Sequence, residues 1–209
     1  MSLDAFSHRL ASCEATPGGG SASAAAGAMS AALLRMVALL TSGSPRFERV
    51  APRARRIADE AESLTARFVA GVDEDAEAFD RVSQAYRLPK STDAEKIGRS
   101  AAIQAALFGA ALPPLHVAEM ACEAALLAVE LAEFGNPNAI SDVGCAALLA
   151  ASAARGAGFN VSINAKALKD RARADDLLQR LQHTLAQVGV LVEVVLGKVQ
   201  ADVEQQGRP

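Results

Sequence analysis

The chain contains 209 residues and carries a formal net charge of −3 with a pI of about 5.7. This length predicts a single domain over residues 1–209, and the acidic balance argues against a basic surface for nucleic acid. Hydrophobic residues make up 51% of the chain but aromatic residues only 4%, so Ala, Leu and Val must supply the core. Because Ala has the highest helix propensity and lets helix backbones approach closely, the composition predicts an all-α protein.

Cysteine usage and the absence of a leader indicate the compartment. Cys13, Cys122 and Cys145 are an odd number without paired spacing, which favours a reducing environment. The N-terminus has no basic segment followed by an apolar run, as a secretory signal would. The apolar stretches Ala22–Leu40 and Cys145–Ala154 fall short of a convincing span of ~20 residues. We therefore expect a cytoplasmic protein with neither membrane nor nucleic acid as a partner.

Apolar residues at helical spacing predict three helices in the first part of the chain. The first covers residues 2–14 and is stopped by Thr16-Pro17-Gly18-Gly19-Gly20. The second, from Ala22 to about Leu40, is small and apolar nearly all round, which is typical of a helix buried on most faces. The third, from about Arg53 to Arg87, has one apolar face with acids and bases opposite.

A fourth helix begins at the capping box Thr92-Asp93-Ala94-Glu95 and extends to Phe134, where Gly135 provides a C-terminal stop. Pro113-Pro114 lies inside this segment. Because proline lacks the N–H that an α-helix needs, we expect the pair to bend or break the helix.

The last part of the chain predicts further helices. Ser141-Asp142 is expected to cap an Ala/Leu helix that stops at a short break, Gly156-Ala157-Gly158. Residues 160–164 alternate in polarity and fit either a brief extended piece or the start of another helix. From about Asp175 to Glu204 one long helix is favoured, although Val188–Leu196 is Val-rich and leaves a strand open as the alternative.

Metal and nucleotide motifs are missing from the sequence. His8, His116 and His183 are far apart, and none has a ligand partner at helical spacing. The glycine run Gly18-Gly19-Gly20 lacks the Lys-Ser/Thr of a phosphate-binding loop and follows a helix instead of a strand. We therefore expect no metal site and no nucleotide fold.

A glycine turn before a helix is the first candidate site. Its backbone N–H groups, with Ser21 or Ser23 as the expected cap, can attract a carboxylate or phosphate, although a flexible connector fits equally well. A second candidate is the polar loop Asn136-Pro137-Asn138 with Ser141-Asp142, which fits ordinary capping or recognition of a heterocycle.

Basic residues near a helix start form the third candidate. Lys90, Lys96 and Arg99 cluster there, and such a cluster is either solvated or bound to an anionic ligand.

Six short motifs, taken in order, resemble the cyclodeaminase/cyclohydrolase family, to which the C-terminal domain of formiminotransferase-cyclodeaminase belongs. They cover nearly the whole chain: Thr16-Pro17-Gly18-Gly19-Gly20-Ser21, Asp75-Ala76-Glu77-Ala78-Phe79, Leu88-Pro89-Lys90, Gly135-Asn136-Pro137-Asn138, Ser141-Asp142-Val143-Gly144 and Asn160-Val161-Ser162-Ile163-Asn164. The resemblance implies an orthogonal or up-down bundle of long Ala/Leu-rich helices, a homodimer, and a tetrahydrofolate substrate that carries a one-carbon group. It implies no metal or redox cofactor.

Two departures leave the substrate open. The sequence has no formiminotransferase domain, and the segment Ser42–Phe47 lacks the lysines often seen there in relatives.

The chemistry implied by the family defines expected roles. Both the cyclodeaminase and the cyclohydrolase reaction pass through a tetrahedral carbon between N5 and N10 of the folate, so a carboxylate beside that carbon is needed. We expect Asp142 to supply it. Hydrogen bonds to the pterin edge are expected from Asn136, Asn138 and Asn164 with Ser141 nearby, and the glutamate tail is expected at Gly18, Gly19, Gly20 and Ser21 or at the cations Lys90 and Arg99.

Three functions follow from these features. The family name places formiminotetrahydrofolate cyclodeaminase first and methenyltetrahydrofolate cyclohydrolase second. A catalytically silent helical dimer that serves as an interaction module is the alternative of another class, but the polar turns at the helix ends argue against it.

Overall fold

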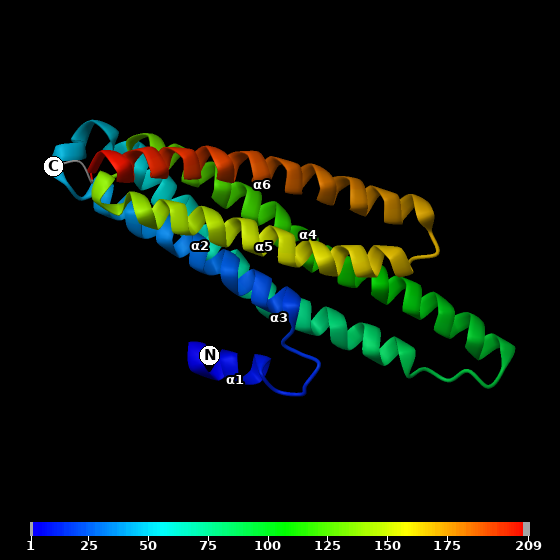
Figure 1. The fold of residues 1–209 in the computed structure, drawn as a ribbon. Helices are drawn as coiled ribbons and strands as arrows, with labels where there is room; N and C mark the ends of the chain where they lie inside the picture. The colour runs from blue at the N-terminus through cyan, green and yellow to red at the C-terminus, as the bar shows by residue number, and fades with distance from the viewer. Residues whose placement is uncertain (1, 207–209) are drawn as a thin grey trace.

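The computed structural model describes residues 2–206, which form α-helices and two 3₁₀ turns with no strand (Figure 1). The helices are α1 (Leu3–Leu10), α2 (Gly19–Ser42), α3 (Ala51–Tyr86), α4 (Asp93–Phe134), α5 (Ile140–Ala167) and α6 (Arg171–Gln206). The 3₁₀ turns η1 (Pro45–Val50) and η2 (Pro137–Ala139) precede α3 and α5. The prediction of an all-α bundle of long helices is confirmed.

The core lies between the five long helices, which run lengthwise beside one another, whereas α1 lies beside the bundle on a loop (Figure 1). Helix α2 packs against α3, α4 and α5. Its Leu34 and Val37 are completely buried. Close packing depends on small residues: a Cβ atom on Gly27 would overlap the ring of Phe68, which is itself completely buried. Helix α1, in contrast, buries none of its residues.

Neither predicted interruption breaks its helix, and at the proline pair a tertiary contact supplies a donor that the helix lacks. Helix α4 continues through Pro113-Pro114, although Pro114 cannot donate to the carbonyl of Ala110. The side-chain amide of Asn164 donates to that carbonyl instead. Helix α5 likewise continues through the predicted break at Gly156-Ala157-Gly158 and includes residues 160–164.

The glycines of α5 serve helix packing. A Cβ atom on Gly156 would overlap the Ser23 hydroxyl of α2, and one on Gly158 would lie 3.2 Å from a methyl group of Leu181 in α6. Absence of a side chain at these positions therefore lets α2 and α6 approach α5 closely.

The predicted helix ends are partly correct. Thr92 and Glu95 form the expected capping box, and the long C-terminal helix is continuous through residues 188–196. The predicted caps of α2 and α5 are wrong: Gly18 precedes α2 and Ala139 precedes α5, each without a side-chain capping bond. In both cases the helix starts earlier than the hydroxyl and carboxylate residues that the sequence offers.

By length and composition alone, α2, α4 and α6 are apolar enough to cross a membrane. This differs from the sequence-based expectation that no apolar stretch is long enough to span a membrane. The most apolar windows of α2 and α4 are 44% and 50% buried inside the bundle, so packing against neighbouring helices covers much of their apolar surface.

Candidate active site

A cleft of about 450 Å³ lies where the N-terminus of α2 meets α3, α4 and α5. Its wall combines the glycine turn with polar and apolar side chains: Ala15, Thr16, Gly18, Gly19, Gly20, Asp75, Phe79, Val82, Tyr86, Leu107, Ala110, Asn160, Ile163, Asn164 and Ala167. Asp75 is the only charged residue among these lining residues. The cleft is therefore an apolar slot with one carboxyl group and two amide side chains for directed chemistry.

Helix α3 places Asp75 against the first turn of α2. The completely buried hydroxyl of Ser21 lies 3.1 Å from Asp75 Oδ2 and 3.0 Å from the carbonyl oxygen of Val72. A hydroxyl has only one hydrogen, so it cannot donate to both oxygens at once. If Asp75 is protonated, the carboxyl donates to Ser21 and Ser21 donates to Val72, and every group is paired. The geometry therefore suits a carboxyl group that holds a proton.

Burial raises the pKa of Asp75 above its ordinary value, and hydrogen bonds from the Ser21 hydroxyl and backbone N–H partly oppose this shift. Removal from water disfavours the charged carboxylate, whereas donors at a helix N-terminus favour it. The two influences leave a group that can accept and return a proton more readily than an exposed aspartate.

Gly20 is required by this arrangement. A Cβ atom at Gly20 would overlap the carboxyl group of Asp75, so any larger residue would force Asp75 away from the helix end. Gly18 and Gly19 line the cleft beside it. The glycine turn was expected to attract an anion from a ligand, but the structure places a carboxyl group of the same chain there.

Ser21 was expected to bind substrate. It is completely buried and absent from the cleft wall, so it holds Asp75 and does not face a ligand. This corrects the role assigned to Ser21 from the sequence.

Helix α5 contributes two amides to the opposite wall. Asn164, as expected, lies in the cleft, and its Nδ2 donates to the carbonyl of Ala110 at 2.9 Å. Asn160 lies one turn earlier on the same helix face, and its Nδ2 donates to the carbonyl of Gly156 at 3.3 Å.

A basic hollow of about 380 Å³ adjoins the cleft, because Tyr86 lines both. Its lining contains four cationic residues and no acidic one: Lys90, Lys96, Arg99 and Lys169. Arg99 donates from Nη2 to the backbone carbonyl of Tyr86 at 2.9 Å and lies over the Tyr86 ring. The predicted cations Lys90 and Arg99 therefore lie together and next to the cleft.

The remaining predicted residues lie near the other end of α5. Asn136 accepts from the backbone N–H of Asn138 and so caps η2, while Ser141 is exposed and Asp142 occupies the first turn of α5. Along this helix Asp142 is about 27 Å from Asn160. Within one protomer, Asp142 therefore lies far from the cleft that Asn164 lines, although both were expected at one folate site.

Asp75 and Asn160 are the residues that motif reasoning passed over. Val72 and Phe79 belong to the apolar stripe of α3, and Asp75 lies at helical spacing from both. An acid on an apolar face is the signal that identifies it. Asn160 precedes Asn164 by four residues, which places the two amides on one face.

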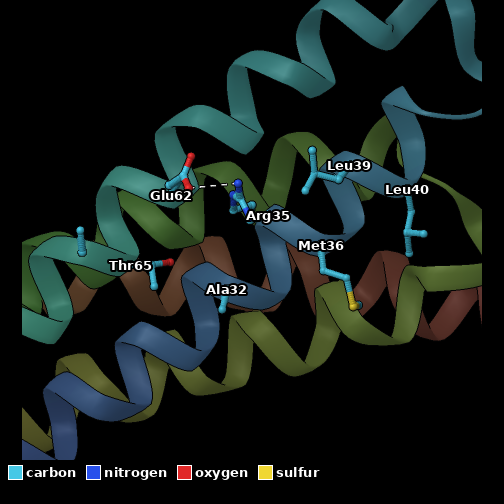
Figure 2. A pocket seen from close by; sticks show the side chains of 8 residues that line it. Ala32, Arg35, Met36, Leu39, Leu40, Glu62 and Thr65 are labelled. Carbon is cyan, nitrogen blue, oxygen red and sulfur yellow. Dashed lines mark ion pairs between the residues drawn. The ribbon is translucent and has the colours of Figure 1, made fainter. Parts of the chain in front are cut away.

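A different, apolar groove of about 720 Å³ lies between α2 and α3 (Figure 2). Of the polar groups that Figure 2 shows there, Arg35 Nη2 pairs with Glu62 at 3.0 Å and the Thr65 hydroxyl donates to the carbonyl of Ala61. The buried Nε of Arg35 has no hydrogen-bond partner among the described residues. No group of three His, Cys, Asp or Glu side chains that can hold a metal ion occurs among residues 2–206.

An all-helical bundle with a cleft that holds a single carboxyl group and two hydrogen-bonded amides fits an enzyme that acts on a small molecule. Residues 2–183 match the family model described as formiminotransferase-cyclodeaminase, and the chain belongs to this family.

Relatives match over almost the whole chain. A methenyltetrahydrofolate cyclohydrolase from Methylorubrum extorquens is 42% identical over 96% of this chain and 97% of its own length. The formimidoyltransferase-cyclodeaminase of Rattus norvegicus is 34% identical over 97% of this chain, which spans 38% of that longer protein. The crystal structure of a formiminotetrahydrofolate cyclodeaminase from Thermotoga maritima superimposes with a TM-score of 0.88, at 32% identity, over 97% of this chain and 98% of that one.

Proposed function

We propose that the cleft binds a tetrahydrofolate that carries a one-carbon group and that the enzyme is a methenyltetrahydrofolate cyclohydrolase, with Asp75 as its proton-transfer group. The observation that carries the proposal is the position of Asp75 as the only charged residue in the cleft wall. The family name by itself favours cyclodeaminase activity. Similarity over 97% of the length of the Methylorubrum cyclohydrolase favours cyclohydrolase activity instead.

In the cyclohydrolase reaction, water adds to the cationic methenyl carbon between N5 and N10. Asp75, as the carboxylate, accepts a proton from this water and then returns it to N5 as the bond between the carbon and N5 breaks. The water oxygen becomes the formyl oxygen of 10-formyltetrahydrofolate, and the second water proton is released to solvent. A carboxylate also attracts the cationic carbon, and positioned proton transfer contributes about 10²–10⁴-fold in rate.

Cyclodeaminase activity is the second candidate, favoured by the Thermotoga structure at a TM-score of 0.88. In this reaction N10 of 5-formiminotetrahydrofolate attacks the amidine carbon, the N10 proton passes to the imino nitrogen, and a protonated Asp75 donates the second proton that this departing nitrogen needs. Ammonia leaves and 5,10-methenyltetrahydrofolate forms. Because both reactions use one tetrahedral carbon, the same cleft and carboxyl group serve either.

The anionic glutamate tail of the substrate is assigned to the basic hollow. Lys90 has no hydrogen bond or ion pair with any described residue, and Arg99 already lies against Tyr86 at the border of the cleft. Both cations can therefore receive carboxylates that leave the cleft past Tyr86. The N-terminus of α2 is a poorer choice for the tail because Asp75 occupies it.

We also propose that two copies of the chain form a dimer through α2 and α5. These helices are antiparallel neighbours, because Ser23 lies at Gly156 and Ser30 donates to the carbonyl of Ala146. Their outward side chains are large and apolar: Met29, Met36, Leu39 and Leu40 from α2, and Leu148, Phe159 and Ile163 from α5.

The total surface supports association. The chain exposes 11274 Å², whereas a monomer of 21.6 kDa is expected to expose about 9,200 Å². Part of this excess follows from the elongated bundle, and the apolar face of α2 and α5 is the surface that a second copy would cover.

Light scattering after size exclusion tests the dimer. Leu148→Glu, which puts a charge on the proposed interface, should give monomer, while Val69→Glu on the exposed surface of α3 should leave the dimer intact. A wild-type protein that runs only as a monomer, or two variants with equal behaviour, would contradict the interface.

The proposed chemistry is proton transfer and nucleophilic addition, so no metal or redox cofactor is assigned to it. We assign the protein to the cytoplasm, where reducing conditions keep thiols free; Cys13 and Cys145 are exposed and unbridged.

The ultraviolet absorbance of methenyltetrahydrofolate tests the function in both directions. Loss of this absorbance above the buffer rate identifies a cyclohydrolase, and gain of absorbance from 5-formiminotetrahydrofolate with ammonia release identifies a cyclodeaminase. If folded protein gives neither change in absorbance, the result favours the hypothesis that the protein is a catalytically silent helical dimer. Thermal denaturation with a tetrahydrofolate derivative at 100 times its Kd separates these cases further, because binding adds about 2.7 kcal/mol to the free energy of unfolding.

A further inference from the structure

The proline pair of α4 begins one turn after Gly109 and Ala110, and Ala110 lines the cleft. Because proline has no N–H, the carbonyls four residues before Pro113 and Pro114, those of Gly109 and Ala110, have no intrahelical donor at these positions. Asn164 supplies a donor to one of them, since its Nδ2 lies 2.9 Å from the Ala110 oxygen. Pro114 therefore leaves open an acceptor inside α4, and a side chain from another helix uses it.

This contact determines which way the Asn164 amide faces. A carbonyl oxygen only accepts, so the NH₂ group must point at Ala110 and Oδ1 must point away from it. No described residue donates to this Oδ1. Asn160 has the same arrangement, with Nδ2 on the carbonyl of Gly156 and Oδ1 without a donor in the described chain. Both residues line the cleft, so its α5 wall carries two amide oxygens that have no donor in the described chain.

The two acceptors define the chemistry of the edge that they recognise. Residues four apart on one helix face have Cβ atoms about 6 Å apart, which suits two donors on one side of a planar ring system. A ring N–H beside an exocyclic amino group has this pattern. A ligand with acceptors at those positions would leave both amide oxygens unpaired in a partly buried wall, which weakens binding strongly.

We propose that Asn160 and Asn164 are specificity-determining residues that accept hydrogen bonds from the N3–H and 2-amino edge of the reduced pterin, and that Pro114 is a positioning residue that acts through Asn164. This inference rests on the proposed function for the identity of the ligand. The orientation of the Asn164 amide by Pro114 is a property of the chain alone, so it can be tested separately.

Steady-state kinetics with methenyltetrahydrofolate tests the specificity. Asn164→Ala should raise KM about tenfold with kcat within about twofold, since one hydrogen bond to substrate is lost and Asp75 is unaffected. Pro114→Ala supplies an N–H that competes for the Ala110 oxygen, so it should raise KM in the same direction by a smaller factor. Pro113→Ala is the matched control: it restores an N–H to Gly109, which Asn164 does not contact, and KM should stay unchanged.

Combining the substitutions tests whether Pro114 acts through Asn164. The double variant Asn164→Ala with Pro114→Ala should have the KM of Asn164→Ala alone, because nothing remains for the proline to position. Effects that multiply, or equal effects of Pro113→Ala and Pro114→Ala, would overturn the positioning role. Competition by 6-methyltetrahydropterin should be about tenfold stronger than by its N3-methyl derivative, and Asn164→Ala should remove this difference.

A substrate-free measurement separates failure of this inference from failure of the proposed function. Hydrogen exchange of the Asn164 side-chain amide, followed by NMR in the unliganded protein, should be slow in the wild type and in Pro113→Ala and about tenfold faster in Pro114→Ala. Equal exchange in all three proteins would refute the positioning of Asn164, whatever the substrate. Slow exchange with no turnover of any folate would instead contradict the proposed ligand.

Discussion

Asp75→Asn is the substitution that most directly tests the candidate site. It keeps the size of the side chain and removes the ability to exchange a proton. In the structure the carboxyl group is hydrogen-bonded to Ser21 and lies in a cleft with no other charged residue in its wall, so no neighbour replaces it. Loss of positioned proton transfer should lower kcat about 10²–10⁴-fold, equivalent to about 2.7–5.4 kcal/mol in the activation free energy.

Stability should behave differently from activity. An asparagine oxygen can still accept from the backbone N–H of Ser21, and the neutral amide has no charge to remove from water. The free energy of unfolding of Asp75→Asn should therefore stay within about 1 kcal/mol of the wild type. Absorbance at the methenyltetrahydrofolate band gives kcat, and urea denaturation at fixed protein concentration gives the stability.

Asp142→Asn is the matched control, because it tests the carboxylate that motif reasoning selected. Asp142 lies in the first turn of α5, where a negative charge contributes about 0.3–1 kcal/mol through the helix dipole. If Asp75 performs the chemistry, Asp142→Asn should lose that stability and keep its activity per folded molecule. An inactive Asp142→Asn beside a fully active Asp75→Asn would refute the assignment of Asp75.

Three other features give separate predictions. Gly27→Ala forces a methyl group into the Phe68 ring and should lower the unfolding free energy by about 1–3 kcal/mol in urea denaturation. In Gly189→Ala the added methyl group meets no atom within 4 Å, so this variant should raise the unfolding free energy by about 0.5–1 kcal/mol. Thr92→Ala removes the capping box of α4 and should lower the Tm, with a loss of about 0.5–2 kcal/mol. The raised pKa of Asp75 means that the native state binds more protons than the unfolded state just above the ordinary aspartate pKa of about 3.9. Wild-type stability should therefore fall as pH rises through that window, and the same denaturation series on Asp75→Asn should lack this fall.

The helices and their order were predictable because their signals are local. Apolar spacing in α3, the alanine content of α2 and the capping box before α4 each depend on residues within a few turns. Helix continuity at Pro114 and Gly156 was not predictable, because the groups that these positions meet, Asn164 at the Ala110 carbonyl and Ser23 beside Gly156, belong to other helices.

Composition and motif order determined an all-helical bundle and its family, and they predicted the glycine turn, Asn164 and the cations Lys90 and Arg99 as components of the candidate site. The three-dimensional fold alone decided which carboxyl group faces the cleft. Asp75 begins a short motif, and Asp142 lies at the expected start of a helix. From the sequence alone, the two carboxyl groups are therefore equivalent candidates for the site. A helix of 28 residues then separates Asp142 from Asn164, while the packing of α3 on α2 brings Asp75 to Gly20 and Ser21. Proximity between residues far apart in the sequence depends on how whole helices pack, and a motif contains no information about that distance.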